Sequence, residues 1–306
     1  MMLVLIGATA GQAVVWYAGQ FYALFFLQSM LKVDLTVSYL LIAAALVLAT
    51  PFFLFFGWLS DRIGRKKIIM AGCLIAACTY IPIFKGITHY ANPAIEEAST
   101  SSPAVVVADP ETCSFQFDPV NLRKFTSSCD VATAALARAG VPYTVSPAPA
   151  GSLAVVNVGQ GKVPSYEAEG LAGDALKTQS AAFGTELRTA LNAAGYPEKA
   201  DTSRINVPMT IFLLWLLVIY VTMVYGPIAA YLVELFPTRI RYTSMSLPYH
   251  IGNGWFGGFL PAISFALVAA TGNIYYGLWY PILIAIMSLI IGGLFLRETR
   301  GVDITK

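Results

Sequence analysis

The chain has 306 residues, of which 57% are hydrophobic and 12% are charged. Soluble domains carry about a quarter charged residues, so this composition excludes a protein that is soluble over its whole length. The net charge is +2 and no basic stripe with interleaved aromatic residues occurs, which leaves nucleic-acid binding without support. Charged residues are rare outside residues 89–207, a block of ordinary polar composition. We therefore expect two membrane blocks, 1–88 and 208–306, separated by a soluble insert at 89–207.

Six apolar segments are long enough to cross a bilayer core, which takes about 20 helical residues. They predict an all-α integral membrane protein that carries a small α+β insert. The first span begins at the initiator Met1, with neither a basic flank nor a signal-peptide cleavage site. We expect from this that further spans precede it. The six predicted spans cover residues 3–30, 38–58, 68–88, 208–235, 244–270 and 275–296.

Basic residues predict the orientation, because they gather in short cytoplasmic loops. If the spans alternate in direction, the opposite short connections hold only Lys32. We expect both termini to be cytoplasmic and the insert to lie outside the membrane, in a bacterial inner membrane. The basic residues that share the predicted cytoplasmic side are Arg62, Arg65, Lys66, Lys67, Arg239, Arg241, Arg297, Arg300 and Lys306.

The insert contains Cys113 and Cys129, which could form a disulfide in an oxidising compartment or remain two free thiols. We favour the disulfide. Cys73 and Cys78 lie within a predicted span and suit packing positions. No His and Cys spacing indicates a metal site, and no cofactor motif occurs.

Periodicity and turn residues predict the elements of the insert. Strands are expected at 105–107, 141–145 and 153–158, and helices at 128–139 and 171–194, with a linker at 98–103. No phosphate loop, nucleophile elbow or metal constellation accompanies them, so enzymatic activity lacks support. We favour a structural or gating cap over a ligand-binding domain.

The connection after the second span reads Gly57-Trp58-Leu59-Ser60-Asp61-Arg62-Ile63-Gly64-Arg65-Lys66-Lys67. It resembles the loop signature of the major facilitator superfamily, a Gly followed by Asp-Arg-x-Gly-Arg and further basic residues. Gly57 would let helices approach closely, and Gly64 would allow the tight turn. Asp61 could interact with a helix N-terminus or with a basic partner.

A second motif, Glu234-Leu235-Phe236-Pro237-Thr238-Arg239-Ile240-Arg241, follows the fourth span. It is similar to the element after the tenth span in symporters of that superfamily, where such charges hold one conformation of the transport cycle. The alternative is a set of topology signals without partners, which would not need the two acids. The resemblance implies a cytoplasmic gate motif formed by Gly57, Asp61, Arg62, Gly64, Arg65, Glu234, Arg239 and Arg241.

The segment from Glu234 to Pro261, with its glycine-rich run at 252–258, resembles the metabolite:proton symporter branch. The six spans would then be the C-terminal half of a twelve-span fold. The long insert departs from the family pattern, and so does the absence of a first half. The resemblance implies that the partners are a small metabolite, protons, the bilayer and a missing N-terminal six-span half.

Polar residues inside spans usually face a cavity or another helix. Gln12, Trp16 and Gln20 share one face of the first span, with Tyr17 beside it. In the family this helix lines the central cavity, so these side chains could bind substrate. They could equally form hydrogen bonds between helices.

Proline and glycine interrupt two further spans, at Tyr225-Gly226-Pro227 and between Pro248 and Gly254. Such interruptions often mark transporter sites, which makes Tyr225 and Asn253 candidates. His250 could carry a proton near neutral pH, although we favour a neutral hydrogen-bonding role. No carboxylate lies within a span except Glu234 near one end, so proton coupling would need His250 or the missing half.

These features favour a secondary active transporter, or its C-terminal half, that moves a small metabolite by alternating access with proton coupling. One alternative is a membrane-anchored sensor or receptor that uses the insert. The other alternative is a non-functional truncated transporter. The substrate cannot be read from the sequence.

Overall fold

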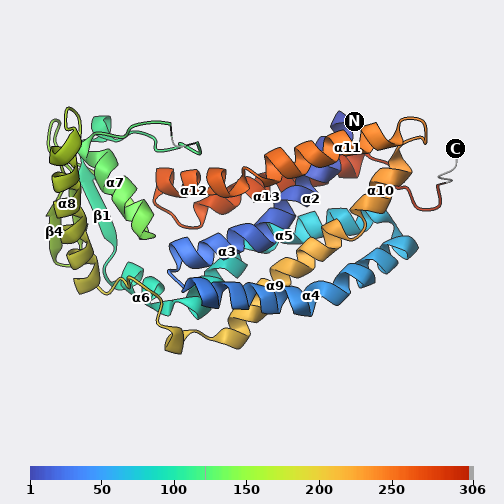
Figure 1. Cartoon of the computed structure of the whole chain (residues 1–306), viewed down its shortest axis with the longest axis horizontal. Helices are drawn as coiled ribbons and strands as arrows, with labels where there is room; N and C mark the ends of the chain where they lie inside the picture. The colour runs from blue at the N-terminus through green and yellow to red at the C-terminus, as the bar shows by residue number, and fades with distance from the viewer. Residues whose placement is uncertain (121, 303–306) are drawn as a thin grey trace.

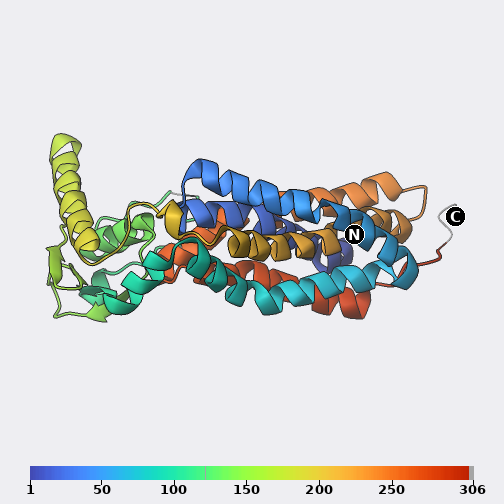
Figure 2. The same ribbon diagram turned by 90° about the horizontal axis from the view of Figure 1, so that it is seen from below.

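The computed structural model describes residues 1–120 and 122–302. Within these, six helical segments are long and apolar enough to cross a membrane. They form an elongated bundle with a small α+β insert at one end (Figure 1, Figure 2). The predicted fold class, an all-α membrane protein with an α+β insert, is confirmed. The six spans are Met2–Met30, Leu35–Ile63, Arg65–Ala91, Val207–Leu235, Arg241–Thr271 and Tyr276–Phe295.

Span 1 occupies the centre of the bundle. Of its most apolar window 72% is buried, against 22% for span 2 and 28% for span 5, which form opposite edges in Figure 1. Span 1 alternates between α-helix and π-helix, a distortion that frequently accompanies functional sites. Its elements are α1 (Met2–Val4), η1 (Leu5–Thr9), α2 (Ala10–Tyr17), η2 (Ala18–Tyr22), α3 (Ala23–Phe25) and η3 (Phe26–Met30).

Spans 2 and 3 are the long helices α4 (Leu35–Ile63) and α5 (Arg65–Ala91), joined at Gly64. Asp34 caps α4, because its carboxylate accepts the backbone N–H groups of Thr36 and Val37. Gly64 has a φ of 117°, a backbone conformation that favours glycine. A single residue can therefore reverse the chain between two spans.

Spans 4 and 5 are both broken near their middle. Span 4 consists of α9 (Val207–Tyr225) and α10 (Ile228–Leu235), separated by Gly226 and Pro227. Span 5 consists of α11 (Arg241–Ile251), the π-helix η6 (Gly252–Gly257) and α12 (Leu260–Thr271). Pro248 lies inside α11, and the π-helix η6 follows it in the glycine-rich run. The 3₁₀ turn η7 (Tyr276–Leu278) and α13 (Trp279–Phe295) form span 6.

The insert begins with helix α6 (Pro93–Ser101), where the sequence analysis expected a linker at 98–103. That prediction was wrong, because polar residues that suit loops can also satisfy a short helix. Pro93 occupies the first turn. Hydroxyl groups of Ser99 and Thr100 donate back to the carbonyl of Glu96, and Ser101 donates to Glu97.

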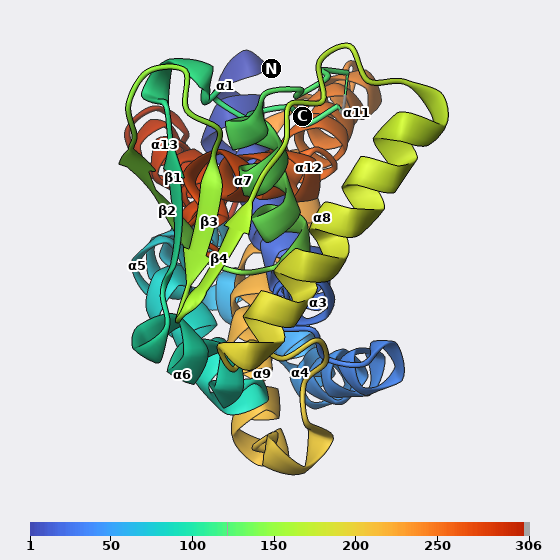
Figure 3. The ribbon, with the colours of Figure 1, turned by 90° about the vertical axis from the view of Figure 1, so that its left-hand side faces the viewer.

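A four-stranded sheet forms the body of the insert, in the order β2-β1-β3-β4. Only the β1–β2 pair is parallel. Helices α7 (Ser128–Ala139) and α8 (Gly173–Ala193) pack against the sheet (Figure 3). Strand β4 was missed in the sequence because it is short and glycine-led. The strands are β1 (Ala104–Ala108), β2 (Tyr143–Pro147), β3 (Val155–Val158) and β4 (Gly161–Pro164), and short 3₁₀ turns occupy Pro110–Thr112 (η4) and Thr202–Arg204 (η5).

The insert has a hydrophobic core of its own, distinct from that of the bundle. Val106, Leu136 and Val156 are fully buried in it. A disulfide joins Cys113 to Cys129, with the Cα atoms 5.1 Å apart. Cys129 lies at the start of α7, so the bridge ties the loop after η4 to the core. In the bundle, Cys73 is buried and Cys78 is exposed, and both are free thiols.

The insert touches the bundle at the ends of spans 1 and 5 that face it. Tyr143 donates its hydroxyl to the carbonyl of Ala269 (2.5 Å) and its backbone N–H to that of Gly272 (3.0 Å). Lys32 Nζ donates to the carbonyl of Arg138 (3.2 Å). Gly140, which ends α7 with a φ of 68°, lies directly against the carbonyl of Ser29. These contacts, the outer junction, connect two spans that belong to different membrane blocks.

Candidate functional site

Two groups of polar residues stand out in the bundle. One is a charged cluster at the end remote from the insert, near the C-terminal residues in Figure 1. The other is a polar–aromatic patch at mid-span, where the distorted parts of spans 1, 4 and 5 meet.

Arg65 is the centre of the charged cluster. Its guanidinium contacts the carboxylates of Asp61 and of Glu234, the latter at 3.1 Å. It also donates to the hydroxyl of Ser60 at 3.0 Å. The side chains of Arg65 and Glu234 are each 14% exposed, so their attraction is screened less than that of a surface pair. The second oxygen of Glu234 accepts the hydroxyl of Thr299 at 2.5 Å.

Glu298 extends this cluster into the segment that follows span 6. Its carboxylate accepts the backbone N–H groups of Arg65 (2.9 Å) and Lys66 (3.4 Å). These are free N–H groups of the first turn of α5, where the helix dipole favours negative charge. In return, Lys66 Nζ donates to the carbonyls of Gly293 and Leu296 at the end of α13. The cluster therefore joins the connection between spans 2 and 3 to the ends of span 4 and span 6.

The structure brings together only part of the predicted gate motif. Arg62 lies over the ring of Trp58, 4.1 Å from its centroid. Arg241 donates to the carbonyl of Phe236 beside Glu234. Arg239 is exposed and makes no ion pair with an acid in the described part of the chain. Of the residues predicted for the gate motif, Asp61, Arg65 and Glu234 are joined by ion pairs.

Gly57 was expected to allow close helix packing, and the structure contradicts this. A Cβ atom at Gly57 would meet no atom within 4 Å among the described residues. The close approach involves Gly226 instead, where a Cβ would lie 3.3 Å from the carbonyl oxygen of Phe53. Asp61 was expected at a basic partner or a helix N-terminus. Its partner is Arg65, while Glu298 occupies the helix N-terminus.

Glu298 and Thr299 were not predicted from the sequence. Both lie directly after the last span, next to basic residues that were interpreted only as topology signals. An acid at that position was the available signal, because topology alone does not require it. Lys306, also counted among the basic residues, lies outside the described part of the chain.

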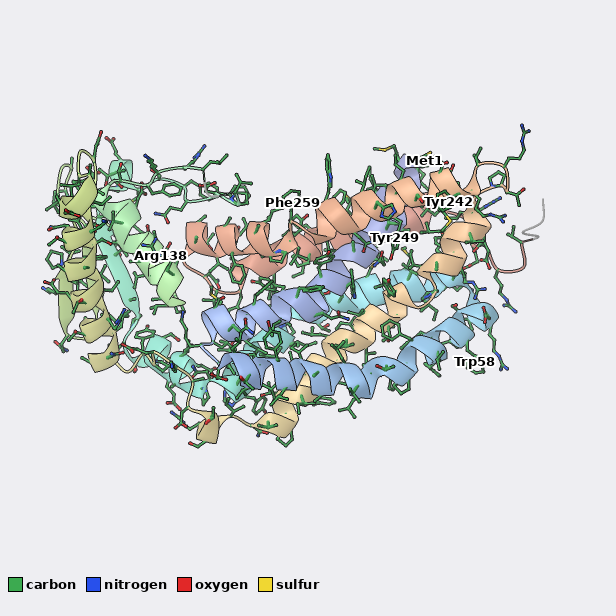
Figure 4. The ribbon with its side chains drawn as sticks, in the orientation of Figure 1. Met1, Trp58, Arg138, Tyr242, Tyr249 and Phe259 are labelled. Atoms are coloured by element: carbon green, nitrogen blue, oxygen red, sulfur yellow. A yellow bond between two sulfur atoms is a disulfide. The ribbon has the colours of Figure 1, made fainter. Side chains whose placement is uncertain are left out.

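The polar–aromatic patch consists of Gln12, Trp16, Tyr225, Tyr249 and Asn253. Gln12 is fully buried, and its amide exchanges hydrogen bonds of 3.3 and 3.4 Å with that of Asn253. Asn253 also donates to the carbonyl of Tyr249 at 2.9 Å. The hydroxyls of Tyr225 and Tyr249 lie 3.1 Å apart. Figure 4 shows Tyr249 on the side of α11 that faces the bundle.

Aromatic rings complete this patch. The rings of Trp16 and Tyr225 lie 5.5 Å apart with an interplanar angle of 30°. All members except Gln12 are half-buried. The patch thus gathers aromatic rings, two amides that bond to each other and two hydroxyls at mid-span.

Three predicted substrate residues are not members of the patch. Tyr17 adjoins it, because its ring has an edge contact with the ring of Trp16 at 5.1 Å and packs against Gly257 and Phe21. Gln20 is half-buried, a turn beyond the patch on span 1. His250 is exposed on α11 and has an edge contact with the ring of Tyr249. Tyr249 was missed as a candidate, although it adjoins Pro248 in the interrupted span.

Six helical segments long and apolar enough to cross a membrane define the chain as a multi-pass membrane protein. Residues 185–306 match the model of the family "Sugar (and other) transporter". The resemblance to the major facilitator superfamily is confirmed for this part of the chain, which carries span 4, span 5 and span 6.

Curated relatives that match part of the chain are also named as transport proteins. A "Putative metabolite transport protein" of Haemophilus influenzae is 42% identical over 98 residues, 30% of this chain and 21% of the relative. A "Citrate-proton symporter" of Salmonella typhi is 36% identical over 94 residues, again 30% and 21%. A "Glycine betaine/proline/ectoine/pipecolic acid transporter" of Dickeya dadantii is 34% identical over 76 residues, 25% and 15%. The chain thus matches about a fifth of the length of these relatives. No solved structure matches it.

Proposed function

We propose that the chain is a secondary active transporter, or its C-terminal half, that moves a small metabolite by alternating access with proton coupling. The observation that carries the proposal is Arg65, held between Asp61 and Glu234 at one end of the bundle. Charges that join two membrane blocks can hold that end closed in one state and separate in another. The polar–aromatic patch would contact the substrate.

The proposed organisation is a first membrane block at 1–88, an extracytoplasmic domain at 89–207 and a second membrane block at 208–306. Both termini would be cytoplasmic, in a bacterial inner membrane. The separate core of the insert supports the division, and the basic residues around the charged cluster support the orientation. A second six-span half would complete the transporting unit.

For the insert we propose a gating role. The outer junction ties the ends of spans 1 and 5 together through Tyr143, Gly140 and Lys32. The charged cluster closes the opposite end. If alternating access separates these spans on the outer side, the junction must loosen at that step. This contact favours a gating cap over a sensor, because it holds the spans themselves.

The proposal is tested by uptake into proteoliposomes that contain the full chain, with an imposed pH gradient. Radiolabelled citrate and radiolabelled glycine betaine serve as probes, since relatives bear those names. We expect accumulation of one of them, abolished by a protonophore. The Arg65→Gln variant should lose uptake, whereas Lys67→Gln removes an equal charge from an exposed position and should retain it.

Two results would contradict the proposal. Equal uptake by both variants would contradict the gating role of the charged cluster. Uptake of neither probe under any gradient would argue against transport by this chain alone. For coupling, His250→Gln is the informative variant. Retained uptake with an unchanged pH dependence would exclude His250 as the proton carrier.

A further inference from the structure

A cavity of about 450 Å³ lies where the insert meets the outer ends of the spans. Cavities of about 300–1,000 Å³ at the interface of two domains are common binding sites for small molecules. This one, the junction cavity, is separate from the polar–aromatic patch. Its polar lining comes from the end of α5, from α6, from the start of β2 and from the connection between α12 and η7: Lys85, Thr88, Glu96, Tyr143, Asn273 and Tyr275.

Lys85 supplies the available charge in the junction cavity. Its ammonium lies 5.9 Å from the centroid of the Tyr275 ring, and its side chain is exposed. No carboxylate pairs with it in the described residues. Glu96, the acid of the cavity wall, contacts His89 Nδ1 at 2.7 Å, and His89 does not line the cavity. Among the described residues, Lys85 is therefore the charged group of the lining that has no partner of opposite charge.

The remaining walls are apolar, with Ile95 and Ile274 among them. Asn273 uses its side-chain oxygen to accept the backbone N–H of Tyr275, and the donor side of that amide can serve a ligand. A ligand that fits these walls has an apolar body and one anionic group. A second anionic group would approach Glu96 and be repelled.

We propose that the junction cavity binds a small organic monocarboxylate, with Lys85 as the residue that pairs with its carboxylate. The apolar body lies against the isoleucine side chains and the Tyr275 ring. Tyr143 and Gly272, which form the outer junction, also line the cavity. Occupancy therefore stabilises the docking of the insert on span 5. The site does not depend on transport.

The test is calorimetric titration of the purified full chain with benzoate, a monocarboxylate with an apolar ring. Benzyl alcohol serves as the uncharged analogue, and phthalate serves as the analogue with a second carboxylate. We expect saturable binding of benzoate, at least tenfold weaker binding of both analogues, and at least a tenfold loss of benzoate affinity in Lys85→Gln. Lys85→Arg should retain binding.

Lys162→Gln is the matched control, because Lys162 is exposed on β4 and does not line the cavity. It should bind benzoate like the unmodified chain. The proposal is overturned if benzoate does not saturate the unmodified chain, or if Lys85→Gln binds it unchanged. It is also overturned if Asn253→Ser loses benzoate while Lys85→Gln retains it, since that would place the ligand in the mid-span patch. A failure of the uptake experiment would leave these binding results unaffected.

Discussion

The contact between the first and last spans gives a sharp test of the bundle, through two adjacent glycines. Gly292 on α13 lies against the backbone of Gly7 in η1. A Cβ atom at Gly292 would approach the carbonyl oxygen of Gly7 far more closely than the 3.0 Å limit that real Cβ atoms respect. Gly293, the next residue, is exposed and would place a Cβ in open space.

The expected cost of Gly292→Ala follows from this geometry. The clash involves backbone, so no side-chain rotation can relieve it and the two helices must move apart. Overpacking of this kind costs about 1–3 kcal/mol. Gly293→Ala avoids the clash and gains up to about 1 kcal/mol from the better helix propensity of alanine. Alanine gains this propensity at both positions of α13, so the two variants should differ by the cost of the clash, about 1–3 kcal/mol.

The assay is thermal unfolding of the purified chain in detergent, followed by tryptophan fluorescence. For a chain of this size about 1 kcal/mol corresponds to roughly 2–4 °C, so the midpoint of Gly292→Ala should lie at least about 2 °C below that of Gly293→Ala. Equal midpoints would refute the reasoning, because they would mean that spans 1 and 6 do not meet at Gly7.

Three further predictions concern other contacts. Arg65→Gln should destabilise the chain by about 1.5–3 kcal/mol through lost hydrogen bonds to charged groups, measured by the same unfolding assay, and a midpoint equal to that of Lys67→Gln would contradict the charged cluster. Gly140→Ala should lower the midpoint more than Gly170→Ala, since both glycines have positive φ but only a Cβ at Gly140 meets the carbonyl of Ser29, at 2.8 Å; equal shifts would argue against the outer junction. Backbone N–H groups of Gly151 and Glu111 lower the pKa of Asp109, so its contribution to folding is fully present above the pKa of about 3.9 of an unfolded aspartate and is lost as the pH falls through the lower folded value. Acid unfolding of the insert, followed by hydrogen exchange, should lose this pH dependence in Asp109→Asn, and an unchanged acid transition would exclude the Asp109 contacts.

The sequence was sufficient to predict the spans, because long apolar runs leave few alternatives in a membrane. It also located the ends of α7 and α8, where Gly140 and Gly195 stop the helical pattern. Periodicity could not distinguish α6 from a linker, since serine and threonine suit both. The π-helices of span 1 have no signal in periodicity, because their side chains remain apolar.

Some residues of the candidate sites could be predicted from the sequence, and others could not. Gln12 and Trp16 were found from their polarity within a span, and Tyr225 and Asn253 from the interruptions of their spans; the structure places the four together. Gln20 lies a turn further along span 1, and His250 is exposed on α11. In the gate motif, the partners depend on which helix ends meet. A local motif cannot reveal that Glu298, far along the chain, accepts the free backbone N–H groups in the first turn of α5.

The exchange between α5 and α13 has a consequence for the handling of this protein. Glu298 supplies negative charge to the start of one helix, and Lys66 supplies positive charge to the end of the other. The connection of α4 to α5 at Gly64 is therefore only complete when the segment after span 6 is present. Any truncation at Phe295, or a fusion partner attached directly there, would expose two helix termini together and would alter a loop more than two hundred residues earlier in the chain.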